Sequence, residues 1–133
     1  MNKLKFPKPS ENELAILQIL WEREPATVKD VNEILNRKKP TGYTTTLKLM
    51  QIMHDKGLVT RTTEGAKGKS HLYSSAVTEK QVNGQLLDQF IQRDFRGSAS
   101  SMVMRAIGRS EISPEEIEEI RNFLDGLDNN PPS

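Results

Sequence analysis

The chain has 133 residues, 35% of them hydrophobic and 28% charged, with a formal net charge of +1 and no cysteine. This composition predicts one or two small folded domains, and it excludes disulfides and thiolate metal sites. No apolar run approaches the ~18 residues of a membrane span, and residues 1–9 lack the apolar core of a secretory signal, so we expect a cytoplasmic protein without membrane insertion.

Charge is divided unevenly along the chain. Residues 1–73 hold 13 Lys and Arg against 8 Asp and Glu, whereas residues 74–133 hold 6 against 10. Within residues 37–73 the ratio is eight basic to two acidic. Because a local positive excess attracts phosphates, the sequence predicts a nucleic-acid partner for the first half and a different partner for the second.

Two helices are predicted first. Residues 10–13 (Ser-Glu-Asn-Glu) form a capping box, followed by an apolar stripe that includes Leu17 and Trp21, and this helix is expected to end near Arg23. Thr27 is the expected N-cap of the second helix, with Asp30 near its positive end. The buried face of the second helix is predicted to consist of Val28, Val31, Ile34 and Leu35.

The third helix is predicted over residues 43–56, after a basic, turn-prone connection at residues 37–42, and it is expected to stop at Gly57. At about 100° per residue, one face gathers Thr46, Leu49, Met50, Met53 and Gly57. The opposite face gathers Thr44, Lys48, Gln51 and Asp55, with Thr45 on its flank. The first face is expected to join the core and the second to face outward.

The outer face is polar but mostly uncharged, whereas a solvated helix face would be expected to carry Glu and Lys. Threonine is a poor helix former, yet it can hydrogen-bond base edges or phosphates and contact a thymine methyl. The alternative is that the threonines only cap a ragged helix start. We predict a DNA-binding surface made of Thr41, Tyr43, Thr44, Thr45, Lys48 and Gln51.

A β-hairpin is predicted next, with one strand over residues 58–63, a glycine-bounded basic tip over 65–69 and a returning strand over 70–73. Lys67 and Lys69 at the tip are expected to contact the DNA backbone, although such tips also occur as solubilising turns. Two helices, a turn, a third helix and a cationic hairpin make a winged helix-turn-helix.

Three further helices are predicted after a connection at residues 74–77. Capping boxes at residues 78–81 and 113–116 open the first and last of them, Phe95 and Gly97 end the first, and residues 102–107 form a short apolar helix. Such a thin arm buries little surface alone, so we expect it to pair with a second copy rather than fold back onto the first domain. The predicted dimerisation residues are Leu86, Phe90, Ile117, Ile120, Leu124 and Leu127.

The predicted fold is therefore mainly α, with an N-terminal winged helix-turn-helix and a C-terminal helical dimerisation arm. The expected domains are residues 1–76 and 77–128, and residues 129–133 are expected to form a disordered tail, with fraying from Asp128.

Three segments of the chain, together with the order of the predicted elements, resemble the penicillinase repressor family (BlaI/MecI) over residues 10–127. They are the first helix from Ser10 to Trp21, the third helix from Thr44 through Gly57 to the wing residue Tyr73, and the sequence Ser-Pro-Glu-Glu-Ile-Glu-Glu-Ile-Arg at residues 113–121. The resemblance implies a homodimeric bacterial repressor on a palindromic operator in double-stranded DNA, released when a membrane sensor protease responds to a signal. Thr44, Thr45 and Lys48 match positions at which family members contact DNA.

The chain also departs from the family pattern. Members that are cut by the sensor carry an asparagine-phenylalanine pair in the middle arm helix, where this chain has Arg105 and Ala106. The copper-responsive branch ends in a cysteine-rich tail that is missing here, and Ser75 stands where a proline often follows the wing tyrosine. The inducing signal is therefore left open.

Other classes of function are less well supported by the residues. An enzyme would need clustered acid-base, nucleophilic or metal-binding groups, and the chain offers two histidines, no cysteine and dispersed carboxylates, so no catalytic residue, metal or cofactor is expected. A protein-docking winged helix would carry apolar residues on the outer face of the third helix. A ligand-sensing regulator would use a pocket lined by Phe95, Met102 and Met104.

Overall fold

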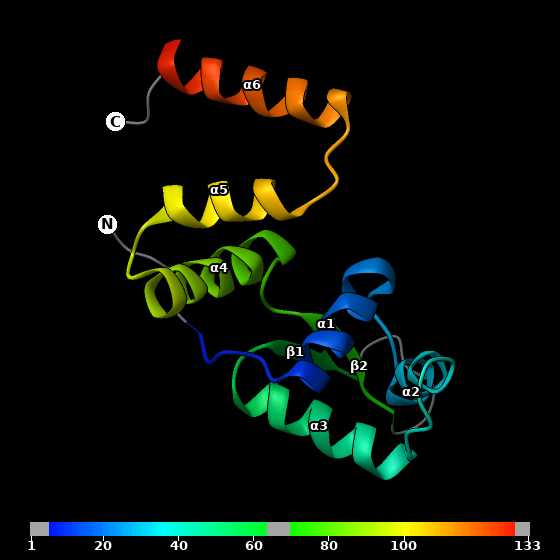
Figure 1. Cartoon of the computed structure of the whole chain (residues 1–133). Coiled ribbons are helices and arrows are strands. Elements are labelled where there is room, and N and C mark those ends of the chain that lie inside the picture. The colour runs from blue at the N-terminus through cyan, green and yellow to red at the C-terminus, as the bar shows by residue number, and fades with distance from the viewer. Residues whose placement is uncertain (1–5, 64–69, 130–133) are drawn as a thin grey trace. The chain divides into compact units, whose positions relative to one another are not determined.

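The computed structural model describes residues 6–63 and 70–129. Its elements are α1 (Glu11–Arg23), α2 (Val28–Asn36), α3 (Tyr43–Asp55), β1 (Val59–Thr62), β2 (Leu72–Ser75), α4 (Glu79–Phe95), α5 (Ala99–Arg109) and α6 (Pro114–Asn129) (Figure 1). The chain forms two compact units, residues 1–88 and 89–133. The first unit is a winged helix-turn-helix, as predicted.

Local capping signals explain where the first helices begin. Ser10 and Glu13 exchange hydrogen bonds across the start of α1, and Thr27 and Asp30 do the same at α2. Gly57, with φ of +80°, follows α3 in the left-handed conformation that glycine tolerates best. The three helices enclose a core whose fully buried members include Ile16, Leu17, Leu20, Val31, Met50, Met53 and Leu58.

The wing pairs β1 antiparallel with β2, in a register that places Arg61 opposite Tyr73. The returning strand lies later than the predicted residues 70–73, because Ser74 and Ser75 continue the pairing opposite Thr60 and Val59. The connection predicted at residues 74–77 is therefore wrong in its first half.

A third segment borders the wing. Ala26 forms a bridge with Tyr73, in which each backbone amide donates to the other residue's carbonyl, at 3.0 and 2.8 Å. Beside it, the Ser75 amide donates to the Glu24 carboxylate at 3.0 Å. Proline has no amide hydrogen, so the serine at this departure from the family pattern makes a contact that proline cannot make.

The N-terminal unit extends into α4, beyond the domain boundary predicted after residue 76. Thr78 and Gln81 form the predicted capping box, Val82 is fully buried in the core, and Leu86 packs against it. The Gln85 amide donates to the Phe6 carbonyl at 2.7 Å, and the Trp21 indole donates to the Val77 carbonyl at 2.9 Å. These contacts tie the start of α4 to α1 and to the segment before it.

The C-terminal unit contains the end of α4 together with α5 and α6, which run in opposite directions (Figure 1). Arg96 and Gly97 have positive φ and end α4, as predicted for Gly97, and Ser98 caps α5. Helix α5 begins earlier than the predicted residue 102. Helix α6 continues through Asp128 and Asn129, so the prediction that the chain frays from Asp128 is wrong for these two residues. The rest of the predicted tail, residues 130–133, lies outside the described part. No helix in the described ranges is long and apolar enough to cross a bilayer.

Candidate nucleic-acid interface

Helix α3 divides into the two faces that its sequence predicts. Thr46, Met50 and Met53 are fully buried, and Leu49 is half-buried. The outward residues Thr44, Thr45, Lys48 and Gln51 are all exposed, and the Tyr43 side chain before them is 51% exposed. Helix α3 therefore presents a mostly polar outward face, and the chain brings five of the predicted DNA-binding residues together on it.

The start of α3 is not capped by a threonine. Its N-cap is Gly42, which has no side chain to hydrogen-bond the first-turn amides. Within the described part of the chain, the hydroxyls of Thr44 and Thr45 have no hydrogen-bond partner. The alternative that these threonines serve as caps is therefore wrong. The uncapped amides and free hydroxyls suit phosphate oxygens and base edges at the positive end of the helix.

A polar network holds the connection between α2 and α3. The Asn32 amide nitrogen donates to the Thr41 carbonyl at 2.9 Å and to the buried Thr46 hydroxyl at 2.8 Å. The side-chain nitrogen of Asn36 donates to the Thr41 carbonyl at 3.0 Å, and the side-chain oxygen of Asn36 accepts from the Thr41 backbone amide at 2.8 Å. Thr41, half-buried, thus uses its backbone for the turn, and its hydroxyl donates to the Lys39 carbonyl.

The asparagines of this network were not predicted as site residues. Their sequence signal is a pair of asparagines four residues apart on α2, which places two poor helix formers on the same side of one helix.

An ion pair holds the other end of α3. Lys56, its C-cap, lies 3.0 Å from both carboxylate oxygens of Glu13, whose side chain is almost completely buried on α1. Burial alone would raise the pKa of Glu13. Hydrogen bonds from Ser10 and Lys56, together with the Lys56 charge, outweigh burial and leave the pKa below its ordinary value. Glu13 is therefore ionised at neutral pH and links the start of α1 to the end of α3.

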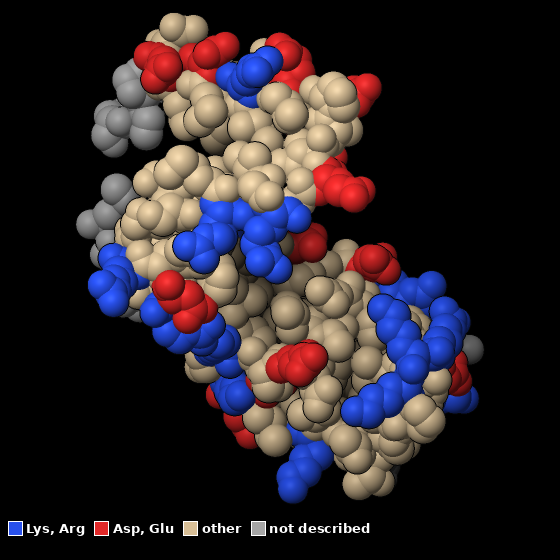
Figure 2. Space-filling view, viewed as in Figure 1, with Lys and Arg blue, Asp and Glu red and all other residues tan. Residues whose placement is uncertain are grey.

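Basic residues adjoin this surface. Figure 2 shows Lys and Arg side chains gathered over α2 and its connection to α3. Exposed cations in this part of the sequence are Lys29, Arg37, Lys38 and Lys39. Arg61 on β1 is also exposed, whereas the predicted wing-tip contacts Lys67 and Lys69 lie outside the described residues. The cations are suited to phosphate contacts flanking α3.

One outward residue of α3 is apolar. Ile52 is 37% exposed and lies four residues after Lys48, on the same side of the helix. It was not predicted as a site residue, although the same angular pattern places it there. An apolar side chain among polar ones can contact a thymine methyl in the major groove.

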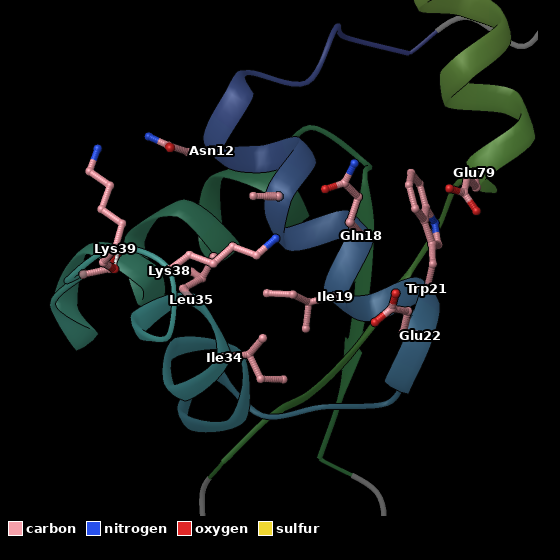
Figure 3. A pocket seen from close by; sticks show the side chains of 12 residues that line it. Asn12, Gln18, Ile19, Trp21, Glu22, Ile34, Leu35, Lys38, Lys39 and Glu79 are labelled. Carbon is pink, nitrogen blue, oxygen red and sulfur yellow. Dashed lines mark hydrogen bonds between the residues drawn. The ribbon is translucent and has the colours of Figure 1, made fainter. Parts of the chain in front are cut away.

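A hollow of about 570 Å³ lies elsewhere on the N-terminal unit, between α1 and α2 (Figure 3). Its apolar wall includes Ile19, Ile34 and Leu35, and Lys38 extends across it toward Gln18 (Figure 3). The remaining lining residues are Asn12, Ala15, Trp21, Glu22, Lys39, Thr41 and Glu79. The hollow is lined by no outward residue of α3 and by none of the residues predicted to line a ligand-sensing pocket.

The C-terminal unit exposes large apolar side chains. Neither α5 nor α6 contains a buried residue. On α6, Phe123 is 66% and Leu124 53% exposed, and Phe123 was missed in the predicted stripe. The other exposed members of the unit are Phe90, Val103, Met104, Ile107, Ile117 and Leu127, while Ile120 is half-buried. Val103 and Ile107, on the predicted short apolar helix, are thus exposed within a single chain.

The comparisons with known proteins point to one family. The family described as Penicillinase repressor matches residues 9–126. The methicillin resistance regulatory protein MecI of Staphylococcus aureus is 26% identical over 115 residues, covering 86% of this chain and 91% of MecI. The transcriptional regulator BlaI of Mycobacterium tuberculosis is 27% identical over 135 residues, covering 97% and 94%. Among solved structures, a MarR protein from Peptoclostridium difficile aligns with a TM-score of 0.47 at 16% identity, covering 91% of this chain and 69% of that one.

Proposed function

The chain belongs to the penicillinase repressor family of transcriptional repressors, and from this membership we propose that it represses transcription as a homodimer on a palindromic operator in double-stranded DNA. Helix α3 enters the major groove, and the cations beside it contact the phosphates. Because its DNA target is in the bacterial cytoplasm, the repressor acts there.

The observation that carries this proposal is the outward face of α3. Thr44, Thr45, Lys48 and Gln51 are exposed together, although nothing in the fold requires threonine there. Hydroxyl, amide and ammonium groups are those that read base edges and hold phosphates. A protein-docking winged helix would show a mainly apolar surface at this place, whereas the large hydrophobic side chains exposed on α3 are Tyr43 and Ile52, beside the four polar ones.

The homodimer is supported by the uncovered apolar side chains of the C-terminal unit. Single exposed apolar residues are ordinary on a protein surface, but two helices such as α5 and α6, which contain no buried residue, need a partner to be stable. Phe90, Ile117, Ile120, Leu124 and Leu127 are proposed to form the interface with a second copy. Leu86, the sixth residue predicted there, is already packed against the core of its own chain.

Release from the operator is proposed to use a signal other than cleavage between Arg105 and Ala106. Both residues are exposed on α5, so burial does not protect this bond and the proposal rests on the replaced residue pair. Cleavage elsewhere in the arm by a membrane sensor protease would still lower the affinity for the operator. Two N-terminal units that are no longer linked lose the gain in effective concentration that linkage provides.

The direct test is selection of bound duplexes from a random-sequence DNA library with the wild-type chain. The expected product is a sequence with two symmetric half-sites about one helical turn apart, or a multiple of that distance. Recovery of no preferred sequence, at salt concentrations where the chain still binds DNA, would contradict the proposal.

A further inference from the structure

The contacts between α2 and α3 determine the direction in which the outward face of α3 points. We infer that Asn32 is a positioning residue for sequence recognition: through the Thr46 hydroxyl it fixes the rotation of α3 about its own axis, and so sets where Thr44 and Thr45 meet the bases. This inference rests on the proposed function of α3 in reading DNA. Asn32 is half-buried on α2 and lies on the inner side of α3, so its effect is transmitted through the protein.

The start of α3 has few other constraints on its rotation. Gly42 provides no side-chain cap, and Tyr43, Thr44 and Thr45 are exposed. Thr46 is the first fully buried residue of the helix, and its hydroxyl accepts from Asn32 at 2.8 Å. The same Asn32 nitrogen donates to the Thr41 carbonyl at 2.9 Å, immediately before the helix. One amide group thus holds both the entry to α3 and its first buried side chain.

Asn36 reinforces this position of Asn32. Its nitrogen donates to the Asn32 side-chain oxygen at 3.1 Å and to the Asn32 carbonyl at 2.9 Å. These bonds leave the Asn32 nitrogen directed at Thr41 and Thr46, and they determine which end of the amide faces α3. Exchange of the amide oxygen and nitrogen would set an oxygen against the Thr41 carbonyl.

A small rotation of α3 is enough to affect reading of a base. Side-chain tips lie about 5–6 Å from a helix axis, so a rotation of roughly 20° moves them by about 2 Å. Good hydrogen bonds span only about 0.5 Å in donor–acceptor distance. Phosphate contacts by long, flexible lysines tolerate such a displacement better. Loss of the Asn32–Thr46 bond therefore affects sequence preference more than general affinity for DNA.

The experiment compares two duplexes, one recovered by selection with the wild-type chain and one scrambled version of the same composition. For Asn32→Ala we expect the ratio of the two affinities to fall about tenfold, the scale of one lost base contact, with affinity for the scrambled duplex unchanged. Asn83→Ala is the matched control, because Asn83 is exposed on α4 and its side chain makes no hydrogen bond in the described part. This control is expected to keep the wild-type ratio.

Thr46→Val and Thr46→Ser separate positioning from stability. Valine keeps the buried volume and removes the acceptor, so it should reduce the ratio as Asn32→Ala does, whereas serine keeps the hydroxyl and should restore it. A purely structural role lowers the unfolding midpoint and the active fraction, which reduces both affinities equally and leaves the ratio unchanged. If Asn32→Ala does not fold, the valine and serine pair decides.

An unchanged ratio in a folded Thr46→Val chain overturns the inference while leaving sequence-specific binding intact. If selection with the wild-type chain yields no preferred duplex, the proposed function itself fails. The two failures are therefore distinguishable.

Discussion

At the scale of single residues, the surface proposed to bind DNA includes hydroxyl groups that make no hydrogen bond within the described residues. The hydroxyls of Thr44 and Thr45 are exposed and unpaired in the described part of the chain, whereas the hydroxyl of Thr46, in the next position, is buried and bonded to Asn32. Of three consecutive threonines, two are thus proposed to contact DNA, and the third lies in the protein interior.

Replacing Thr44 or Thr45 with alanine is expected to reduce affinity for the selected duplex by about 1–3 kcal/mol, as for a lost base contact. Alanine is the better helix former, so the helix itself should not weaken. Fluorescence anisotropy on selected and scrambled duplexes measures the effect, with Asn83→Ala as the control. Equal losses on both duplexes would show that the threonines do not read bases.

The Glu13 carboxylate has a folded-state pKa below its ordinary value, which makes stability depend on pH. Its contribution is fully present above the unfolded-state pKa of about 4.3 and is lost as pH falls through the lower folded-state pKa. Denaturant unfolding of wild type and Glu13→Gln should therefore show a stability gap at pH 7 that narrows below about pH 4. A gap of the same size at pH 7 and pH 3 would contradict this role of the charge.

At the scale of elements, local signals in the sequence predict helix starts well. The capping boxes at Ser10, Thr78 and Ser113 have the hydrogen bonds that their spacing predicts, because donor and acceptor lie three residues apart. The two faces of α3 were also predictable, since they depend only on helical periodicity. Among the described residues of their unit, none covers the exposed apolar side chains of α5 and α6, and the dimer proposal depends on these side chains.

Features that join distant segments could not be predicted from local patterns. The bridge between Ala26 and Tyr73, the extension of β2 to Ser75 and the contact of Asn32 with Thr46 each pair residues that only the folded chain brings together. For the candidate site, the outward residues of α3 were therefore predictable, and the residues that hold α3 in place were not.

Leu124→Asp is expected to convert the proposed dimer into monomers, because an unpaired charge in an apolar interface costs several kcal/mol. Analytical ultracentrifugation measures the change. Asn122→Asp is the matched control, since it adds the same charge at an exposed polar position of α6 and should leave the dimer intact. A dimeric Leu124→Asp chain would exclude this face of α6 from the interface.

At the scale of the whole molecule, the two units differ in charge and in exposed chemistry. The N-terminal half has a basic excess and a mostly polar outward face on α3, whereas acidic side chains predominate on α6 (Figure 2). We therefore propose that DNA recognition and dimer assembly use different parts of the chain. Linkage of two N-terminal units through a dimer would give an affinity for DNA that a single unit lacks.

The proposed regulation also involves the whole molecule, because it depends on whether the C-terminal arm is cleaved. A sensor protease of the penicillinase type is expected not to cut between Arg105 and Ala106, because the family's asparagine-phenylalanine pair is replaced there. Incubation of the purified chain with such a protease, followed by mass spectrometry of the fragments, tests this. A clean break at that bond would be the contrary result, and a break elsewhere would identify another site.

The most direct test of sequence-specific repression by a dimer is the affinity of the wild-type chain for three duplexes, measured at several salt concentrations. They carry both selected half-sites, one half-site, or a scrambled sequence. We expect two chains on the duplex with both half-sites, bound at least about 10³-fold more tightly than the scrambled duplex, and intermediate affinity for the single half-site. Equal affinity for all three duplexes would contradict the account.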